Sequence, residues 1–303
     1  MSDKLSIAWW NTSISPSSCL NRMNDKQYNL ALSVISKLIY DYNIDIFCLG
    51  EISERNVLDL SEMLKNELYK IYDGCFKSEK CKIKHDMCII YNSEQLILLE
   101  STDIARQTHL GAIRAGIELK FYHVRTEQIF IIYVLHWPSR LGNGFQEGSS
   151  KRYELGSTVR QAINNCNLSS DESYHIVIGD FNDEPFDLSL VEGLGSTRDR
   201  SLVTKKGELL YNPFWRHIGH ATPHMDNDDT GTWGTCYYHS DPITKWRTFD
   251  QILFSPSFLK KNKWSLKEES VKIIQGYELE EHIYDRNSYF DHLPVMASME
   301  YSL

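Results

Sequence analysis

The order of its short β-branched runs limits the folds open to this chain more than any other feature. Apolar runs at residues 5–10 and 45–49 alternate with segments of helical periodicity at 26–42 and 53–68, a pattern typical of parallel strands with helices outside them. The runs that come next have few helix signals between them and indicate an antiparallel meander: residues 68–73, 86–92, 95–104, 112–121 and 128–136. The chain therefore begins as an α/β protein and continues as a sheet-rich one.

The second half adds one helix and several strands to this pattern. A helical segment at 150–166 leads into the apolar run Ile176–Ile178. Further strands are expected at 248–255, 264–274 and 293–301. No Gly/Ser-rich or Pro-rich linker divides the chain. We therefore predict a single domain over residues 1–303, with two packed sheets and helices on their outer faces.

Composition excludes several classes of protein. Hydrophobic residues at 42% and charged residues at 24% are ordinary values for a soluble globular protein. No apolar stretch approaches the length of a membrane span, and the N-terminus lacks the regions of a signal peptide. The seven cysteines form no CxxC pair, which favours reduced thiols over disulfides or a zinc knuckle. We expect a cytoplasmic protein.

The charge balance bears on possible partners. The net charge of −9 argues against a protein that coats nucleic acid through a large basic field. It leaves room for a nuclease with a local groove, especially one that binds a divalent metal.

Residues 174–185 indicate where chemistry would lie. The run Ile176–Ile178 ends at Gly179 and is followed by Asp180, Phe181 and Asn182. Because side chains alternate along an extended backbone, Asp180 and Asn182 point to the same side. Strand ends are where α/β proteins place their sites. The alternative is a polar strand end that enters a turn, since Asp and Asn are common turn residues.

Other predicted strands also begin or end in polar residues. The full set at strand ends is Asn11, Glu51, His136, Asp180, Asn182, Asp250, Asp291 and His292. An oxygen-rich site with several carboxylates suits Mg²⁺ or Mn²⁺, whereas a site with no Cys and few His does not suit structural zinc. Each residue also has a structural alternative: Asn11 in a turn, Glu51 at a helix start, Asp291 in a plain loop. The prediction depends on their joint occurrence.

In its motifs the chain resembles the endonuclease/exonuclease/phosphatase superfamily. The matching stretches, in the family's order, are Trp10-Asn11, Gly50-Glu51, Leu135-His136-Trp137-Pro138-Ser139-Arg140, Gly179-Asp180-Phe181-Asn182, Asp250-Gln251-Ile252 and Asp291-His292-Leu293-Pro294. His-Trp-Pro-Ser-Arg and Gly-Asp-Phe-Asn are most similar to a bacterial branch of the superfamily. One departure is Phe290, where many members have Ser before Asp-His, so any role of that hydroxyl is absent here.

The resemblance implies a four-layer α/β/β/α sandwich and a metal-dependent hydrolase. It implies that Glu51 holds Mg²⁺ or Mn²⁺, with Asp291 and Asn11 close to the metal or its waters. The metal would offset charge in the transition state of an in-line hydrolysis without a covalent intermediate.

The resemblance also implies roles for the residues around the water and the phosphate. Asp180 would orient and deprotonate the attacking water, and Asn182 would hydrogen-bond the water or a phosphoryl oxygen. His292, paired with Asp250, would contact the phosphoryl group, with the carboxylate favouring the imidazolium. His136 would contact the phosphate from the opposite side.

Four further residues are expected around the substrate. Asp86 would support His136, and Arg114 would contact phosphate. Arg140 would hold a neighbouring phosphate because it lies four residues from His136. Trp137 would either stack on a base or pack beneath the site.

Two further groups of residues are not assigned to the predicted site. His217, His220 and His224 have helical metal-ligand spacing, but Pro223 argues against a regular helix there. A polar loop over 217–229 at the site mouth is the favoured interpretation. The lysine clusters, including Lys77, Lys80, Lys82 and Lys84, are interpreted mostly as solvated faces.

The sequence thus predicts a Mg²⁺-dependent phosphoesterase whose first-choice substrate is nucleic acid. The alternatives are a phosphatase or phosphodiesterase of a small molecule or lipid headgroup, which the acidic net charge favours, and an inactive binding module. Endo or exo action, the number of metals, oligomeric state and protein partners are left open by the sequence.

Overall fold

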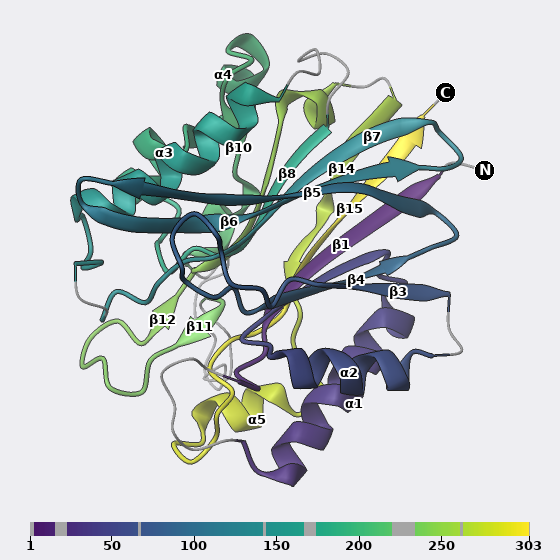
Figure 1. Cartoon of the computed structure of the whole chain (residues 1–303), viewed down its shortest axis with the longest axis vertical. Helices are drawn as coiled ribbons and strands as arrows, with labels where there is room; N and C mark the ends of the chain where they lie inside the picture. The colour runs from purple at the N-terminus through teal and green to yellow at the C-terminus, as the bar shows by residue number, and fades with distance from the viewer. Residues whose placement is uncertain are drawn as a thin grey trace, which may run out of the picture.

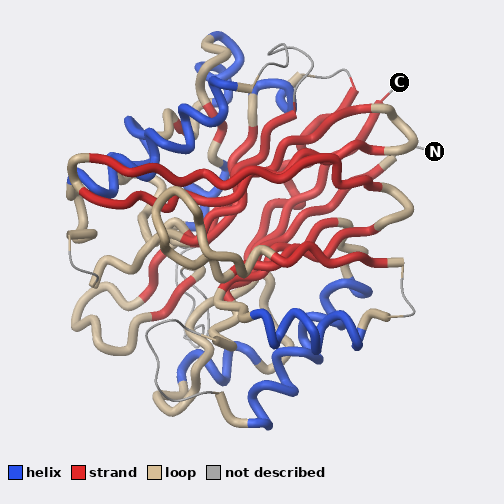
Figure 2. The backbone as a smooth tube through the Cα atoms, viewed as in Figure 1, coloured by secondary structure: helices blue, strands red, loops and turns tan. Residues whose placement is uncertain are grey.

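A computed structural model describes residues 3–15, 23–65, 68–141, 144–166, 174–219, 234–260 and 263–302. Its centre consists of two sheets packed face to face, with helices on the outside (Figures 1 and 2). The predicted sandwich of two central sheets flanked by helices is confirmed.

The first sheet has six strands and takes its members from both ends of the chain. Their order is β14 (Lys263–Ile273), β15 (Val295–Ser302), β1 (Lys4–Asn11), β2 (Ile46–Gly50), β4 (Met87–Asn92) and β3 (Tyr69–Asp73). β1 pairs parallel with β2 and antiparallel with β15. The sheet is therefore mixed.

The second sheet has seven strands and contains the meander. Their order is β5 (Leu96–Thr108), β6 (Gly111–His123), β7 (Gln128–His136), β8 (Tyr174–Asp180), β13 (Asp250–Phe254), β10 (Leu210–Tyr211) and β9 (Ser196–Thr197). β7 and β8 are parallel, whereas β13 runs antiparallel to β8. A separate hairpin joins β11 (Cys236–Tyr237) to β12 (Trp246–Arg247).

Helices cover the outer face of each sheet. α1 (Asp25–Asp41), α2 (Glu54–Met63) and α5 (Leu279–Tyr284) pack on the six-stranded sheet, and α3 (Ser150–Asn165) packs on the other. Short helices, η1 (Ser189–Gly193), α4 (Arg200–Lys205), η2 (Pro213–His217) and η3 (Pro256–Leu259), lie in the connections. In the described part of the chain no helix is both long and apolar enough to cross a membrane.

Strand alternation explains how the layers are held together. On β1, Ile7 and Trp9 face the core between the sheets, whereas Ala8 and Trp10 face the helical layer. A strand buried on both faces needs apolar residues at consecutive positions. This is why the four residues from Ile7 to Trp10 are all apolar, and why the first polar side chain of functional interest comes at the strand's end.

The pairing registers place the predicted site residues at one end of the sandwich. Asn11 lies opposite Gly50, the residue before Glu51. On the other sheet His136 and Asp250 both lie opposite Asp180, on either side of β8. The parallel and antiparallel pairs therefore bring distant segments to one edge.

Candidate active site

Two glycines let the strand ends approach closely enough to form the site. A Cβ at Gly179 would lie 1.9 Å from the Leu135 carbonyl oxygen, and a Cβ at Gly50 would lie 2.7 Å from the Trp9 ring. Neither position can hold a larger residue without movement of its neighbours. Gly179 thus keeps Asp180 beside His136, and Gly50 keeps Glu51 beside Asn11.

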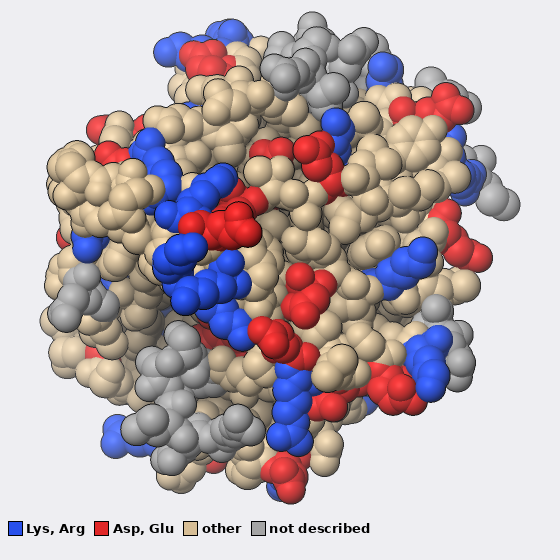
Figure 3. Space-filling model, viewed as in Figure 1, with Lys and Arg blue, Asp and Glu red and all other residues tan. Residues whose placement is uncertain are grey.

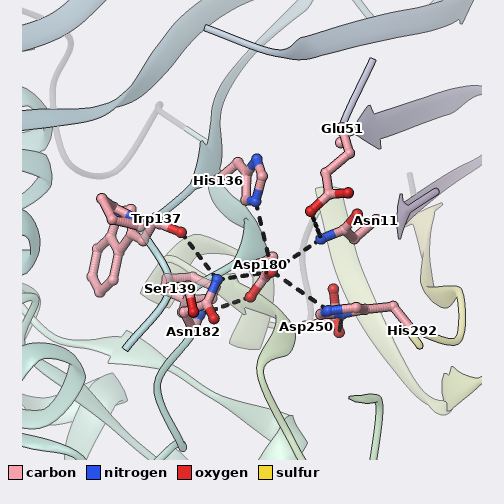
Figure 4. Close-up of polar contacts among 12 residues, drawn as sticks. Asn11, Glu51, His136, Trp137, Ser139, Asp180, Asn182, Asp250 and His292 are labelled. Atoms are coloured by element: carbon pink, nitrogen blue, oxygen red, sulfur yellow. Dashed lines mark hydrogen bonds and ion pairs between the residues drawn. The ribbon is translucent and has the colours of Figure 1, made fainter. Parts of the chain in front are cut away.

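Asp180 lies at the centre of the predicted residues, as Figure 4 shows. Its Oδ2 accepts hydrogen bonds from the side-chain amides of Asn11 at 3.2 Å and Asn182 at 3.0 Å. The Nε2 atoms of His136 and His292 lie 3.9 and 3.8 Å from the same oxygen. One buried carboxylate oxygen therefore faces two amides and two imidazoles.

Asn182 is fixed by a turn that follows the strand. Its φ of 48° is in the left-handed region, which Asn tolerates better than most residues. Its backbone N–H donates to Asp180 Oδ1 at 2.7 Å, and its amide donates to the Trp137 carbonyl at 3.0 Å. The turn that was the structural alternative for this segment is thus present. It orients the side chains of both Asp180 and Asn182.

His292 is held by a buried carboxylate. Its Nδ1 lies 2.7 Å from Asp250 Oδ2, and the other oxygen of Asp250 accepts a 2.7 Å hydrogen bond from the Trp9 indole. Trp9 is on the first sheet and Asp250 on the second, so this contact joins the two sheets beneath the site. The predicted His–Asp pair is present in the structure.

His136 has a matching arrangement on the opposite side of Asp180 (Figure 4). Its Nδ1 lies 3.0 Å from Asp86 Oδ1, and Arg114 contacts the same carboxylate at 3.3 Å. Arg114 also donates to the backbone carbonyls of Lys84 and His136. Asp86 lies where a support for His136 was expected. Arg114 was expected to contact phosphate, but it binds protein groups and supports the Asp86–His136 pair.

Burial and charge shift the pKa values in this cluster. Burial raises the pKa of Glu51 to about 7, with the nearby histidines acting in the opposite direction. Burial also raises the pKa of Asp180 despite the two imidazoles. Burial opposes the charging of His136, but Asp86 and the other carboxylates outweigh it and raise its pKa to about 9. The pKa of His292 is likewise raised well above its usual value against the effect of burial, with Asp250 the main cause.

The donor set fits a divalent cation. Acidic side chains outnumber basic ones here: Glu51, Asp86, Asp180, Asp250 and Asp291 face Arg114, His136 and His292. Among the described residues Glu51 forms no ion pair, and Asn11 donates to it at 3.4 Å. An oxygen-rich cluster with excess negative charge is what Mg²⁺ or Mn²⁺ binds.

Asp180, Asp250 and His292 also form a group whose potential ligand atoms lie within 4.8 Å of one another. Both oxygens of Asp250 already accept hydrogen bonds from Trp9 and His292. We therefore regard this group as a histidine oriented by its carboxylates. Glu51, whose side chain has as its only described hydrogen bond the long one from Asn11, is the better candidate for a cation ligand. Asn11 presents its amide nitrogen to Glu51 and Asp180, and Asp291 accepts from Ser13 at 2.9 Å.

Two predicted substrate contacts need correction. Trp137 has no exposed surface, donates its indole N–H to the Ala115 carbonyl and packs against Phe181, so it cannot stack on a base and instead packs beneath the site. Arg140 is engaged by Asp183, Asp187 and Glu147, and donates to the Asn182 carbonyl. Its charge is neutralised within the protein, so it positions Asn182 and is not free for a phosphate.

Phe290, where many members of the superfamily have Ser, is also structural. Its ring stacks on Trp10 at 5.9 Å between centroids, and Trp10 donates to the His292 carbonyl at 3.0 Å. The aromatic pair therefore holds the segment that carries His292. Of the expected loop over residues 217–229, only His217, at the end of η2, and residues 218–219 lie within the described residues, which exclude His220 and His224.

Sequence reasoning missed three contributors to the site. Trp9 and Ser13 bind site carboxylates although they belong to an apolar run and a loop. Arg152, buried on α3, donates to Asp183 at 2.7 Å and to the Phe181 carbonyl at 2.6 Å, which ties the Asp180–Asn182 turn to that helix. An arginine on the apolar side of a predicted helix was the available signal for this last contact.

Several solved structures have the same fold as this chain. An endonuclease/exonuclease/phosphatase family protein of Bacteroides thetaiotaomicron aligns at 18% identity over 100% of both chains, with a TM-score of 0.61. A mannosyl-6-phosphatase from the same species aligns at 18% identity over 97% of this chain and 99% of its own, with a TM-score of 0.59. TDP2 of D. rerio, solved with a single-strand DNA product, aligns at 17% identity over 98% of both chains, with a TM-score of 0.62.

Sequence comparisons identify the family. No curated protein matches the chain significantly. The family model described as "Endonuclease/Exonuclease/phosphatase family" matches residues 17–285. Together with the two-sheet fold, this match shows that the chain belongs to the endonuclease/exonuclease/phosphatase family of phosphoesterases.

Proposed function

We propose that this protein hydrolyses phosphodiester bonds of DNA or RNA with a divalent cation. The observation that carries the proposal is the position of Asp180, whose Oδ2 faces two amides and two imidazoles. Beside it lies Glu51, which forms no ion pair with any described residue. This arrangement offers a base, hydrogen-bond donors and a cation site within one cluster.

Glu51 would hold the cation, with Asp291 and Asn11 beside it or its waters. When bound, Mg²⁺ or Mn²⁺ supplies positive charge that polarises the phosphoryl oxygens. The excess of carboxylates over basic side chains supports this assignment. Because Asn11 donates to Asp180 as well, it also links the cation side of the site to the water-activating side.

Asp180 would orient a water molecule and accept its proton. Its raised pKa makes it a stronger base than an exposed aspartate. Asn182, held by its turn, would hydrogen-bond the water or a phosphoryl oxygen. The water would attack phosphorus in line, the bond to the leaving oxygen would break, and no covalent enzyme intermediate would form.

The two histidines would bind the phosphoryl group in their protonated form. Asp250 fixes Nδ1 of His292, and Asp86 fixes Nδ1 of His136, so each Nε2–H points to the space around Asp180. Positive charge on either side of the reacting phosphorus stabilises the charge that develops on its oxygens.

Nucleic acid is the preferred substrate class in this proposal. TDP2 of D. rerio, which has the same fold, was solved with a single-strand DNA product. The second candidate is a small-molecule phosphatase, favoured by the net charge of −9 and by the mannosyl-6-phosphatase among the similar structures.

We also propose that the protein works in the cytoplasm as one catalytic domain. Every cysteine in the described part of the chain is a free thiol, which supports a reducing compartment. The central core takes residues from both sheets, which supports a single unit.

A substrate panel tests the function. Single- and double-stranded DNA, RNA, mononucleotides, sugar phosphates and phospholipid headgroups would be assayed with Mg²⁺, with Mn²⁺ and with EDTA, using Asp180→Asn as the matched control. We expect cation-dependent cleavage of oligonucleotides that Asp180→Asn lacks and that weakens with salt. Hydrolysis of sugar phosphates alone would support the second candidate, and no hydrolysis of any phosphoester would refute both.

A further inference from the structure

A lysine-rich hairpin precedes the strand that begins beside the site. Residues 75–85 lie in the connection between β3 and β4, and residues 77–84 contain four lysines and one acidic residue, Glu79. We call residues 75–85 the lysine hairpin. In a chain with a net charge of −9, this local excess of positive charge is unusual. Figure 3 shows Lys and Arg side chains forming a band over the region where Figure 1 places this connection.

The lysine hairpin is held by its own backbone. Lys77 and Lys84 form a β-bridge, Ser78 N–H donates to the Ile83 carbonyl at 2.9 Å, and His85 N–H donates to the Phe76 carbonyl at 2.8 Å. Lys82 N–H donates to the Ser78 carbonyl at 2.9 Å and has a φ of 61°, which closes the turn. The lysines are thus displayed from an ordered scaffold.

A buried contact fixes this scaffold to the second sheet. Asp103 on β5 accepts from Ser78 Oγ at 2.5 Å and lies 2.9 Å from His85 Nε2. Ser78 and His85 have no exposed surface. Ser78 and His85 thus point inward, whereas all four lysines of the hairpin are exposed.

Most of the positive charge on the lysine hairpin is available to bind an anionic ligand. In the described part of the chain Lys77 and Lys82 form no ion pair, and Lys80 donates to a neutral group, the Asp103 carbonyl, at 2.7 Å. Lys84 pairs with Glu54 at 2.8 Å, with side chains 54% and 65% exposed. An exposed pair of this kind contributes little free energy, so a phosphate can replace Glu54.

The lysine hairpin leads directly into the site. The Lys84 carbonyl accepts a hydrogen bond from Arg114, which also contacts Asp86. Asp86, two residues after Lys84, holds His136. Since two residues span at most about 7 Å, the last lysine lies at the rim of the cluster where the phosphoester would react.

We propose that the lysine hairpin binds the backbone of a nucleic-acid strand, holding phosphates next to the one that is hydrolysed. The inference rests on the proposed nuclease function and adds to it the surface that the strand follows. A strand offers a row of phosphates, which matches a row of lysines on a fixed hairpin, whereas a small phosphomonoester would reach only the catalytic cluster.

The experiment uses the full chain with Lys77→Gln and Lys82→Gln combined. A labelled single-stranded 20-mer would be bound to this variant in an Asp180→Asn background, to prevent cleavage, across a salt series. The matched control is Lys205→Gln with Lys206→Gln, two exposed residues on and after α4. In parallel, the Lys77→Gln, Lys82→Gln variant with Asp180 intact would be assayed for hydrolysis of bis(p-nitrophenyl) phosphate.

We expect the lysine-hairpin variant to bind the 20-mer more weakly and to lose roughly 1.4 from the slope of log affinity against log salt, about 0.7 for each phosphate contact on a single strand. Its hydrolysis of the small diester should equal that of the wild type, and the control variant should bind normally. Unchanged binding, an equal loss in the control, or binding of anionic phosphatidylserine vesicles in place of the 20-mer would overturn the inference. If the wild type hydrolysed no diester, the proposed function would fail independently of the binding result.

Discussion

Among the described residues, two sets of largely buried histidines differ in the direction in which their pKa values are shifted. His136 and His292 at the site have raised pKa values, because carboxylates outweigh the effect of burial. His175, in the seven-stranded sheet, has a pKa lowered to about 4, mainly by burial. Its Nδ1 lies 3.1 Å from the hydroxyl of Tyr133, a neutral partner.

His85 shows that neighbouring carboxylates do not by themselves keep a buried histidine charged, because Asp103 and Asp86 both favour its protonated form and its pKa is still lowered. Asp103 lies 2.9 Å from its Nε2, yet burial and Arg114 together lower its pKa. His136 differs because Asp86, Asp180 and Glu51 all act on it. At the site the carboxylates outweigh burial, whereas at His85 the positive charge of Arg114 adds to the effect of burial.

The sharpest test of this comparison substitutes one histidine from each set in separate variants. His292→Gln should lower metal-dependent hydrolysis by roughly 10³-fold, the usual scale for a group that acts on protons or charge in the transition state. His175→Gln should leave the rate constant within about twofold at pH 7. Steady-state kinetics on a small diester measures both, with thermal unfolding as the check that each variant folds. Equal losses in the two variants would contradict the distinction.

Acid should unfold the protein partly through its core histidines. The pKa of His175 is lowered from about 6.5 to about 4 on folding, so the unfolded chain binds a proton between these values and the folded protein does not. Its contribution to stability is complete above pH 6.5 and falls as the pH drops toward 4, by roughly 3 kcal/mol in all.

Urea unfolding from pH 4 to 8 measures this loss, and His175→Gln should flatten the curve over that range. His136 has the opposite sign: its raised pKa adds stability that is complete below pH 6.5 and lost as the pH rises through about 9. A His175→Gln curve as steep as that of the wild type would show that burial does not discharge this histidine.

Much of the fold and the cluster could be predicted from the sequence because strand ends are local signals. Asn11, Glu51 and Asp180 come at the ends of apolar runs. The rule that parallel strands end at one edge brings Asn11 and Glu51 together, whereas Asp180 reaches them from the second sheet. The strand end at Gly179 and Asp180 could be predicted for the same reason, because a small residue ends the apolar run and a polar one follows.

The parts that could not be predicted depend on side-chain contacts between the layers. Trp137 is adjacent to His136, but alternation along the strand turns it into the core, where it has no exposed surface. Arg140 is paired with Asp183 and Asp187, and nothing in the sequence shows that these carboxylates face it. The support of Asp250 by Trp9 crosses from one sheet to the other, which no local pattern reveals.

The smallest effect, and the most specific to the comparison, should come from removing one carboxylate from the site histidine. Asp86→Asn keeps a hydrogen-bond acceptor for His136 Nδ1 but removes the charge that raises its pKa to about 9. The imidazole should then lose its proton at lower pH, so the alkaline fall in rate should move below the wild-type position, with about a tenfold loss at pH 8. Rates on a small diester from pH 6 to 10 at saturating Mg²⁺ measure the shift.

Asp103→Asn, which removes the carboxylate beside His85, is the matched control and should leave the alkaline limb in place, because that carboxylate holds a histidine outside the cluster. If both variants moved the limb equally, the alkaline limb would have to be assigned to a group other than His136.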